Sequence, residues 1–310
     1  METKTEMPDA KLLEDIIRGQ KNGWKSIGEG SQGNVFKFYM NDHTMFYAAK
    51  TALPGHEREL KMESKILSHL RDKCHSNIVC FTGAVIVDQV YWLVTEFVKG
   101  KELFNAICDG ERPTKEALHA LINGLKVLHE AGVAHLDIKP ENITYDATTG
   151  NIKYLDFGLA CADALGSQCR PKGTPQYMAP EIFNVYTLAA AKKADMWSLG
   201  MTMYVWINNV LPYDEREMYK HTRRDVWQAF VNKHWKCPKK YGAPYDIDLS
   251  LLINIQASER SLDCIVPTQS CAISQVPLKR TTSQILTIQK NSSRNSSGNK
   301  KKRARKSGSP

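Results

Sequence analysis

The sequence predicts an α+β fold with two lobes of unequal size. Residues 35–97 read mainly as strands with one helical segment at 56–71, and helical spacing of apolar residues dominates after Gly100. Strands grouped before helices are typical of α+β folds rather than of alternating α/β folds. A chain of 310 residues is long enough to give both lobes a substantial core.

Each element is expected from its local pattern. Residues 9–20 carry apolar side chains at helical spacing, with Asp9 as a candidate helix cap. Runs of β-branched and aromatic residues predict strands, and two of these runs flank a turn at Asn41-Asp42. The other expected elements are strands at 35–39, 45–49, 83–87 and 90–97, helices at 56–71, 115–131 and 195–208, and a hairpin turn at 146–151.

Charge divides the chain into a folded part and a tail. Ten of the 42 Lys and Arg residues but none of the 33 Asp and Glu residues lie in 269–310, which leaves 32 basic against 33 acidic side chains in 1–268. The net charge of +9 therefore belongs to the tail, where Ser, Thr, Asn and Gln are also frequent. The expected divisions are a helical extension at 1–20, a domain at 21–268 with lobes 21–98 and 99–268, and a disordered tail at 269–310.

Cysteine spacing and apolar content bear on the compartment. No apolar run reaches the length that a membrane span requires, and residues 1–20 are charged rather than signal-like. The eight cysteines show no C-x-x-C spacing, so we expect reduced thiols rather than a disulfide framework or a zinc site. These observations favour a protein of the cytoplasm or nucleus (the host nucleus for a virus-encoded chain) that does not engage membranes.

The most informative stretch is 135–142, His-Leu-Asp-Ile-Lys-Pro-Glu-Asn, which is followed beyond the expected hairpin by Asp-Phe-Gly at 156–158. Phosphoryl transfer needs such a set of side chains. One carboxylate faces the acceptor hydroxyl, and an amide together with a second carboxylate holds magnesium on the triphosphate. Asp137, Asn142 and Asp156 are the candidates for these three positions.

These residues resemble the catalytic loop and the metal-binding turn of eukaryotic-type protein kinases. Residues 173–181 are similar to the segment that closes the activation loop, and 195–200 to the buried helix that braces the catalytic loop. Arg260 stands where the family has an arginine that pairs with the position of Glu181. The resemblance covers residues 20–268. It implies a two-lobed protein kinase-like fold, with a small strand-rich N-lobe and a larger, mainly helical C-lobe.

A glycine-rich loop at 28–35, Gly-Glu-Gly-Ser-Gln-Gly-Asn-Val, lets backbone amides approach phosphates closely. Taken alone, the pattern also fits an ordinary glycine-rich turn. A dinucleotide-binding βαβ unit needs a helix directly after the third glycine, whereas β-branched and aromatic residues follow here. We therefore expect this loop to join two antiparallel strands.

The resemblance implies that Lys50 reaches the α- and β-phosphates of ATP and is held by an acidic residue on the following helix. Glu63 is the favoured partner, because an apolar pair follows it three and four residues later. Glu57 and Glu59 are rival partners.

The adenine and ribose sites are also implied by the resemblance. Thr95 would stand at the back of the pocket, and backbone groups of Glu96 and Val98 would bind the adenine edge. Glu102 would meet the ribose. The full set of expected ATP-binding residues is Ile27, Gly28, Glu29, Gly30, Ser31, Gln32, Gly33, Asn34, Val35, Ala48, Lys50, Glu63, Thr95, Glu96, Val98 and Glu102.

By the same resemblance, Asp137 is the catalytic base and Lys139 neutralises charge on the γ-phosphoryl group. Asn142 and Asp156 would ligate Mg²⁺, a cation that favours oxygen ligands. Lys139 two residues after Asp137, together with Gly-Thr-Pro at 173–175, is typical of serine/threonine kinases. The expected activity is transfer of the γ-phosphoryl group of ATP to serine and threonine hydroxyls of protein substrates.

Three further side chains bear on the substrate. Thr174 would hydrogen-bond near Asp137 and Lys139, which shapes a site for a short hydroxyl side chain. Glu141 and Glu102 together would attract a basic residue upstream of the acceptor. The alternative is that one of these glutamates is structural and the other binds ribose.

Leu136 departs from the family pattern, since most members carry arginine at this position. That arginine pairs with a phosphorylated residue of the activation loop and orders the loop by charge-assisted hydrogen bonds. Aligned back from Gly173, the position that commonly receives the phosphate holds Arg170. We therefore expect activity without activation-loop phosphorylation. The His-Leu-Asp form is also similar to the myosin light chain and death-associated kinases.

The basic run from Lys300 to Lys306 predicts a nuclear localisation signal read by an import receptor, or an arm that contacts nucleic acid. A merely solvated tail is the alternative, and no aromatic residues interleave with the basic ones to stack on bases.

Two other classes of function compete with an active protein kinase. A pseudokinase, which binds or scaffolds on the same fold, is suggested by Leu136 and by Thr144, which replaces an apolar residue at the floor of the nucleotide pocket. The intact Lys50, Asp137 and Asp156 argue against it. A small-molecule kinase is the third class, and the substrate-docking segment at 173–181 argues against that one.

Overall fold

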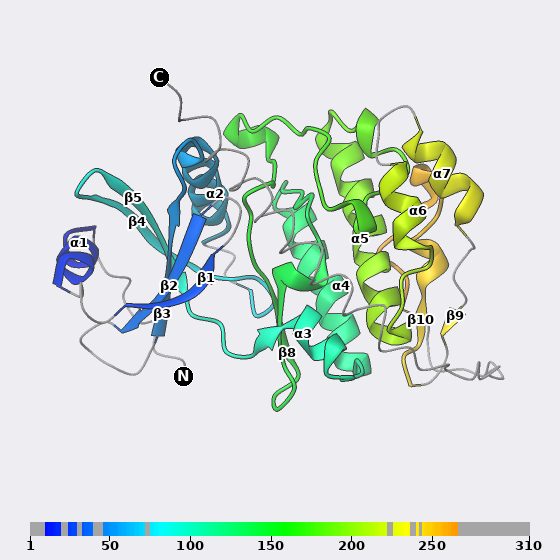
Figure 1. Cartoon of the computed structure of the whole chain (residues 1–310), viewed down its shortest axis with the longest axis horizontal. Coiled ribbons are helices and arrows are strands. Elements are labelled where there is room, and N and C mark those ends of the chain that lie inside the picture. Colours follow the sequence, from blue (N-terminus) through cyan, green and yellow to red (C-terminus); the bar gives the residue numbers. More distant parts are fainter. Residues whose placement is uncertain are drawn as a thin grey trace, which may run out of the picture.

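The computed structural model describes residues 10–19, 24–29, 33–39, 46–71, 75–221, 226–235, 240–241 and 244–265. Within these residues the chain forms a smaller lobe rich in strands and a larger lobe rich in helices (Figure 1). The predicted two-lobed α+β fold is confirmed.

The smaller lobe is built on an antiparallel sheet of five strands in the order β1-β2-β3-β5-β4. Helix α2 (Glu57–Leu70) packs against β3, β4 and β5. The strands are β1 (Lys25–Glu29), β2 (Gly33–Tyr39), β3 (Phe46–Ala52), β4 (Phe81–Val87) and β5 (Val90–Glu96). The strand and helix predictions for this lobe are confirmed, with ends shifted by up to three residues.

The turn between β4 and β5 consists of Asp88 and Gln89, as the sequence predicted. Their φ angles are 51° and 66°. A two-residue type I′ hairpin requires positive φ at both central residues, because this turn matches the twist of the strands that it joins. The other predicted turn, at Asn41-Asp42, lies outside the described residues.

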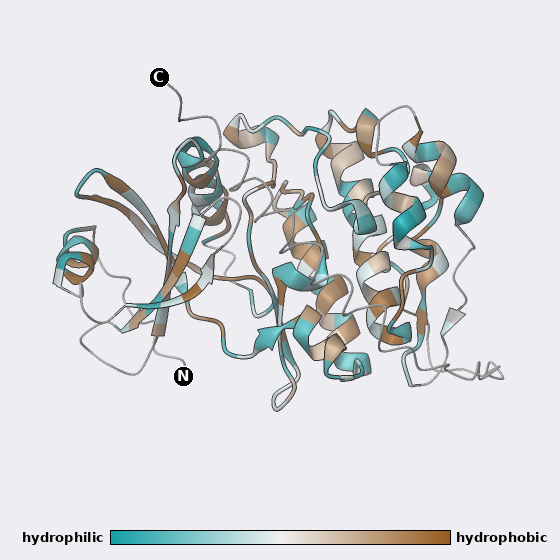
Figure 2. Cartoon of the chain, in the orientation of Figure 1, coloured by the Kyte–Doolittle hydropathy of each residue, from teal (hydrophilic) through white to brown (hydrophobic). Residues whose placement is uncertain are grey.

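Helix α1 (Ala10–Gly19) packs on β4 at the outer side of the smaller lobe (Figure 1). Its buried residues Leu13, Ile16 and Ile17 join a core cluster with residues of β2 to β5. Figure 2 shows the hydrophobic residues of α1 on one side of the helix. A Cβ added at Gly83 of β4 would lie only 2.4 Å from Leu13 Cδ1, so the glycine lets helix and strand approach closely.

The larger lobe contains α4 and α5, two helices that contact each other. Thr114 caps α4 by accepting a hydrogen bond from Ala117 N, and Thr187 caps α5 by accepting one from Ala190 N. The helices are α3 (Leu103–Cys108), α4 (Lys115–Glu130), α5 (Leu188–Asn208), α6 (Glu215–Lys220) and α7 (Trp227–His234). Short 3-10 helices are η2 (Pro140–Asn142), η3 (Asp163–Leu165), η4 (Pro175–Tyr177), η5 (Ile182–Asn184), η6 (Leu249–Leu251) and η7 (Ala257–Glu259).

The start of α5 was predicted at residue 195, and the helix begins seven residues earlier, at Leu188. Ala189, Ala190 and Ala191 open the helix. They favour helix strongly, but in the first seven residues of α5 only Ala191 and Ala194 are buried, so no stripe of large apolar side chains marks the start. A prediction from one-sided periodicity therefore missed the first two turns.

Two small sheets complete the larger lobe. The hairpin predicted around 146–151 is present as β7 (Ile143–Asp146) and β8 (Asn151–Tyr154), and β6 (Lys101–Glu102) pairs with β7. This hairpin separates the catalytic loop from the Asp-Phe-Gly turn and returns the chain so that both can reach one cavity. Strands β9 (Lys240–Tyr241) and β10 (Ile247–Asp248) form a separate pair.

The expectation of reduced thiols is wrong for Cys161 and Cys169, which form a disulfide with each other, and for Cys80, which is also disulfide-bonded. The spacing of Cys161 and Cys169 matches no short motif, and they meet because the chain between them turns back through an antiparallel bridge of Ala162 with Ser167. Such a turn is set by tertiary contacts that cysteine spacing does not reveal. Cys108 and Cys264 are free thiols.

Several predictions fall outside the described residues. They concern Asp9 as a cap, the tail at 269–310, and the basic run from Lys300 to Lys306. In the part of the chain that the structure describes, no helix has the length and apolar character needed to cross a membrane.

Candidate active site

A cavity of about 830 Å³ is lined by residues of both lobes. It brings together most of the described residues that the sequence singled out. Asn34 is an exception, because its neighbours Gly33 and Val35 in β2 line the cavity and Asn34 does not. The predicted residues that line the cavity are Ile27, Gly28, Gly33, Val35, Ala48, Lys50, Glu63, Thr95, Glu96, Val98, Glu102, Asp137, Lys139, Asn142 and Asp156.

The glycine-rich loop joins β1 to β2, which pair antiparallel with Gly28 opposite Val35. The prediction of two antiparallel strands, instead of a βαβ unit, is confirmed. A Cβ at Gly33 would lie 2.1 Å from the carbonyl oxygen of Thr51, so only glycine allows β2 to approach β3 here. The predictions for Gly30, Ser31, Gln32 and the side chain of Glu29 lie outside the described part of the loop.

Lys50 joins the lobes electrostatically. Its Nζ lies 2.8 Å from Glu63 Oε2 on α2 and 2.8 Å from Asp156 Oδ1 in the larger lobe. Glu63 also accepts a 3.2 Å hydrogen bond from the backbone amide of Phe157. The predicted Lys50–Glu63 contact is therefore present, whereas the rival Glu57 accepts hydrogen bonds from Gly55 N at the exposed start of α2.

The three charged groups shift one another's pKa. Burial lowers the pKa of Lys50, but Glu63 and Asp156 outweigh it and hold the pKa above the ordinary lysine value. Burial raises the pKa of Glu63, and Lys50 offsets only part of that effect. Burial also acts to raise the pKa of Asp156, yet Lys50 and the amide of Gly158 keep it below the usual aspartate value. Asp156 is therefore held as a carboxylate facing the cavity.

The back of the cavity is formed by the end of β5. Thr95 pairs with Ala48 of β3 and lines the cavity, followed by Glu96 and Val98. The Glu96 side chain turns away to bond Lys153 Nζ at 2.6 Å and Cys80 N at 2.8 Å. The sequence predicted that backbone groups of Glu96 and Val98 bind adenine, and both residues line the cavity.

The floor of the cavity includes Thr144, which is buried in β7. Its neighbour across the β6–β7 pair is Glu102, whose carboxylate accepts a 3.3 Å hydrogen bond from Asn105 Nδ2. Burial raises the pKa of Glu102. The two residues lie side by side in the wall of the cavity, where Glu102 was predicted to meet the ribose.

Asp137 is the most heavily hydrogen-bonded of the predicted catalytic residues. Its Oδ1 accepts a 2.8 Å bond from the Thr174 hydroxyl, and its Oδ2 lies 2.9 Å from both Lys139 Nζ and Asn142 Nδ2. Lys139 Nζ also donates to Thr174 Oγ1 at 2.8 Å. The carboxylate, the ammonium and the hydroxyl thus form a closed triangle at the cavity wall.

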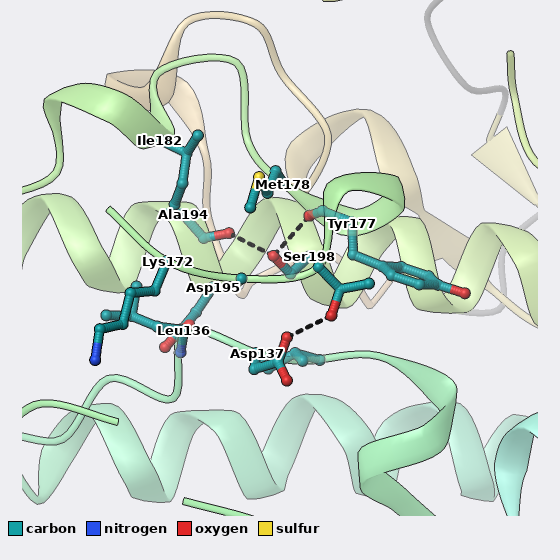
Figure 3. A pocket seen from close by; sticks show the side chains of 12 residues that line it. Leu136, Asp137, Lys172, Tyr177, Met178, Ile182, Ala194, Asp195 and Ser198 are labelled. Carbon is teal, nitrogen blue, oxygen red and sulfur yellow. Dashed lines mark hydrogen bonds between the residues drawn. The ribbon is translucent and has the colours of Figure 1, made fainter. Parts of the chain in front are cut away.

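The backbone at Leu136 is held in a left-handed conformation, with φ of 62°. Such a conformation costs about 1–3 kcal/mol for a residue other than glycine. Asp195 of α5 offsets this cost by accepting from His135 N at 2.8 Å and from Leu136 N at 2.7 Å. Figure 3 shows Leu136, Asp137 and Asp195 around the small pocket between the catalytic loop and α5.

Residues of the core support both motifs. His135 packs against Phe157 with ring centroids 4.8 Å apart, and its Nε2 lies 2.9 Å from the carbonyl oxygen of Leu155. Arg260 is buried and binds Glu181 through two nitrogens, one of them at 2.8 Å. The contact that the resemblance implied between Arg260 and Glu181 is therefore present.

Comparison with known proteins gives this arrangement a family. A family model described as "Protein kinase domain" matches residues 22–289. The chain belongs to the protein kinase domain family. It is similar to "Serine/threonine-protein kinase SAPK4" of Oryza sativa subsp. japonica, at 31% identity over 223 residues that make up 69% of this chain and 60% of that protein.

Other relatives of this protein kinase domain carry similar names. "Serine/threonine-protein kinase H1" of Mus musculus is 28% identical over 278 residues, or 84% of this chain and 64% of that protein. "CBL-interacting serine/threonine-protein kinase 3" of Arabidopsis thaliana is 32% identical over 232 residues, or 69% of this chain and 49% of that protein. The chain spans about half to two thirds of the length of these relatives.

The donor set of this protein kinase domain suits a magnesium ion. Both hydrogens of the Asn142 amide are used, since Nδ2 donates to the backbone oxygen of Asp137 at 2.8 Å and to its Oδ2 at 2.9 Å. The amide therefore offers its carbonyl oxygen to a cation. Asp156 supplies a carboxylate to the same cavity. Two oxygen ligands are typical of sites that bind Mg²⁺ together with substrate phosphates.

Sequence reasoning missed two supporting residues of the kinase domain. His129, at the end of α4, places Nε2 3.0 Å from Asp195 Oδ2 and so helps hold the brace of the catalytic loop. Lys153 of β8 fixes the side chain of Glu96. Each contact joins residues more than 50 positions apart. For His129, the only local signal was its place near the end of the predicted helix at 115–131.

Proposed function

We propose that this protein kinase domain is an active, ATP- and Mg²⁺-dependent serine/threonine protein kinase. The observation that carries the proposal is that one cavity joins the Lys50–Glu63–Asp156 cluster to the Asp137–Lys139–Thr174 triangle. The first group has the charges to bind a triphosphate, and the second has the base to activate a hydroxyl. The names of the relatives support the serine/threonine class.

Each residue of the cavity has a role in the proposed reaction. Bound ATP with Mg²⁺ supplies the transferable phosphoryl group. Lys50, fixed by Glu63, would bind the α- and β-phosphates, and Asn142 and Asp156 would hold the metal. Asp137 would orient the acceptor hydroxyl and take its proton. Lys139 would offset the negative charge that remains at the transferred group.

A short acceptor side chain suits this site. Thr174 and Lys139 occupy the space next to Asp137, with hydrogen bonds of 2.8 Å between the hydroxyl and each of the two charged groups. A serine or threonine hydroxyl has to approach close to this triangle, which favours it over the longer tyrosine. We expect phosphoserine and phosphothreonine as products.

Two glutamates at the cavity suggest a basic substrate. Glu102 and Glu141 both line it, and one oxygen of Glu141 is buried without a hydrogen-bond partner in the described part of the chain. Burial raises the pKa of each carboxyl. An arginine upstream of the acceptor would supply the missing partner and relieve the cost of burial.

We propose that the activity needs no phosphorylation of the activation loop. Leu136 has no side-chain donor for a phosphate, and Arg170 stands where the phosphate would be received. The Lys50–Glu63 pair, which assembles the nucleotide site, is formed without any modification. The site is thus organised by contacts of the unmodified chain.

The direct test is transfer of the γ-phosphoryl group from ATP to a serine/threonine peptide library in the presence of Mg²⁺. Asp137→Asn should lower kcat by about 10²–10⁴-fold, because it removes the base but keeps the shape of the side chain. Asp263→Asn is the matched control, since this aspartate is exposed and pairs with Lys126 away from the cavity. Equal activity of the parent and Asp137→Asn would reject the proposal.

A pseudokinase is the competing function, motivated by Leu136 and Thr144. It predicts that nucleotide binds without phosphoryl transfer, and that Asp137→Asn leaves the biological output unchanged.

The run from Lys300 to Lys306 is proposed to direct nuclear import or to contact nucleic acid. Deletion of residues 300–306 should then reduce nuclear accumulation. An unchanged distribution of the protein between nucleus and cytoplasm would mean that the run acts neither in nuclear import nor in nuclear retention.

A further inference from the structure

The disulfide of Cys161 and Cys169 lies inside the activation segment, the stretch between the Asp-Phe-Gly turn and Glu181. Both cysteines are buried. Cys161 exchanges two backbone hydrogen bonds of 2.9 Å with Ala134, which directly precedes His135 of the catalytic loop. One end of the disulfide is therefore fixed to the chain segment that leads into the catalytic loop.

The chain between the two cysteines forms a closed loop. Ala162 pairs with Ser167, helix η3 covers Asp163–Leu165, and Gly166 turns the chain with φ of 68°. The side chains of Asp163 and Gln168 are exposed. The two buried cysteines are thus the ends of a short loop with exposed side chains, and a thiol can reach the sulfurs once this loop opens locally.

The other end of the disulfide restrains the segment that docks substrate. Cys169 stands four residues before Gly173, where an added Cβ would lie 3.0 Å from the carbonyl oxygen of Leu136. The next residue, Thr174, donates to Asp137 at 2.8 Å. Only residues 170–172 separate the disulfide from these contacts. Leu136 and Lys172 line the same small pocket (Figure 3).

The pairing of an arginine with a phosphate does not order this part of the segment. Leu136 offers no side-chain donor, and Arg170 is a cation whose hydrogen bond goes to Gln168 at 3.2 Å within the segment itself. A covalent link can order the segment instead, because it removes conformations that the open segment would otherwise explore. The disulfide closes the segment at the place where a phosphate would act in a protein that carries arginine at 136.

We propose that Cys161 and Cys169 are a redox modification site, at which disulfide formation orders the activation segment and reduction releases it. The inference rests on the proposed kinase function for its effect on activity, but not for its effect on the segment. The oxidised form docks protein substrate, and the reduced form retains the nucleotide site because Lys50, Glu63 and Asp156 lie outside the closed loop.

The reaction is a thiol–disulfide exchange with a small dithiol. The dithiol gives up two electrons and two protons and becomes a cyclic disulfide, while the Cys161–Cys169 bond breaks and each sulfur gains a hydrogen. In the opposite direction, a small-molecule disulfide accepts the two electrons and leaves as two thiols. No other reactant is required.

The first experiment follows the segment without using activity. The full chain, oxidised or treated with dithiothreitol, is mapped by non-reducing peptide mass spectrometry and then by hydrogen exchange. Reduction should accelerate exchange at residues 159–178 and leave α4 unchanged. Unchanged exchange at 159–178, with the disulfide shown to be reduced, would overturn the proposal even if the protein proved not to be a kinase.

The second experiment measures phosphorylation of a serine peptide. Reduction should raise KM for the peptide at least about fivefold while changing KM for ATP little, because the disulfide state is coupled to peptide docking only. Cys161→Ser/Cys169→Ser should match the reduced parent and should not respond to dithiothreitol. Cys108→Ser is the matched control, since Cys108 is a free thiol on α3, and it should respond like the parent.

The variants separate this disulfide from the other cysteines. Cys80 is also disulfide-bonded, so a response to reductant alone does not identify the site. If the doubly substituted variant still responded to dithiothreitol like the parent, the response would belong to other cysteines and the proposal would be wrong. Equal peptide KM values for oxidised and reduced parent protein would also overturn it. Absence of phosphoryl transfer from every form would instead reject the proposed function.

Discussion

Asp195 holds Leu136, the residue at which the catalytic loop turns. It is fully buried and accepts hydrogen bonds from the amides of His135 and Leu136 and from the ring of His129. The left-handed φ of Leu136 is tolerated because the hydrogen bonds from the two amides to the Asp195 carboxylate stabilise this backbone conformation. The orientation of Asp137, the next residue, depends on this turn.

Asp195→Asn should therefore destabilise the protein by about 1–3 kcal/mol, because an amide offers one acceptor oxygen where the carboxylate offered two, and a buried N–H loses its partner. The melting temperature, measured by differential scanning fluorimetry, should fall together with kcat. Asp263→Asn, an exposed counterpart, should change neither. A melting temperature of Asp195→Asn equal to that of the parent would contradict this account of the turn.

If Glu102 and Glu141 read a basic substrate as proposed, the choice of substrate should depend on pH. Burial raises the pKa of both carboxyls, so they gain protons at a higher pH than an ordinary glutamate. Above the raised pKa values both are charged and attract a cationic side chain, and as the pH falls through those values the attraction is lost. The preference for an arginine-containing peptide over its alanine counterpart, as a ratio of kcat/KM, should decline from about pH 8 to about pH 5.

Substitution separates this effect from a general loss of activity. Glu102→Gln/Glu141→Gln should flatten the pH dependence of the ratio and lower it at pH 8 toward the value of the acidic range. A ratio that stays constant with pH in the parent protein would show that the two glutamates do not read the peptide.

At the scale of elements, α1 is a helix whose place depends on a few buried contacts. Leu13 fills the space above Gly83, and Ile16 and Ile17 extend the same interface. Leu13→Ala should cost about 2–5 kcal/mol at this interface, the range for deletion of a buried leucine side chain. Hydrogen exchange should accelerate in α1 and β4 and much less in α4.

The matched control is Leu12→Ala on the same helix. Leu12 is 49% exposed, and the same substitution there should change stability by no more than about 0.5 kcal/mol. Equal effects of the two substitutions would mean that α1 is not anchored through its buried face.

Elements with local patterns were predictable from the sequence. The hairpins, α2 and α4 carry one-sided periodicity, turn residues or caps within a few positions, and each was predicted close to its ends. The start of α5 was not, because its alanine-rich first turns bury only Ala191 and Ala194 and show no stripe of large apolar side chains. The Cys161–Cys169 pair was hidden as well, since the seven residues between the cysteines had to fold back before the two sulfurs met.

The site residues divide in the same way: those in short motifs were predictable from the sequence, and those that act through distant contacts were not. Lys50, Glu63, Asp137, Asn142 and Asp156 stand in short motifs at family-like spacing, and they line one cavity. The residues that support them were harder to find, because their contacts span long separations. His129 with Asp195 and Lys153 with Glu96 are examples, and neither pair shares a motif.

At the scale of the whole molecule, one ion cluster links the lobes. Lys50 and Glu63 belong to the smaller lobe and Asp156 to the larger, so the cluster forms only when the lobes are closed on each other. Lys50→Met should leave Asp156 without its counterion and raise its pKa toward the ordinary value or above. The nucleotide affinity, measured by calorimetry with ATP and Mg²⁺, should fall, and an unchanged affinity would contradict the role of the cluster.

The central claim is that this kinase domain is assembled for serine/threonine phosphorylation without a phosphate in its activation segment. The most direct measurement is kcat/KM on a serine peptide for protein whose intact mass shows no phosphate after phosphatase treatment, with the disulfide kept oxidised. We predict the same activity before and after treatment. Loss of activity, with the removed phosphate mapped to residues 159–172, would contradict the claim.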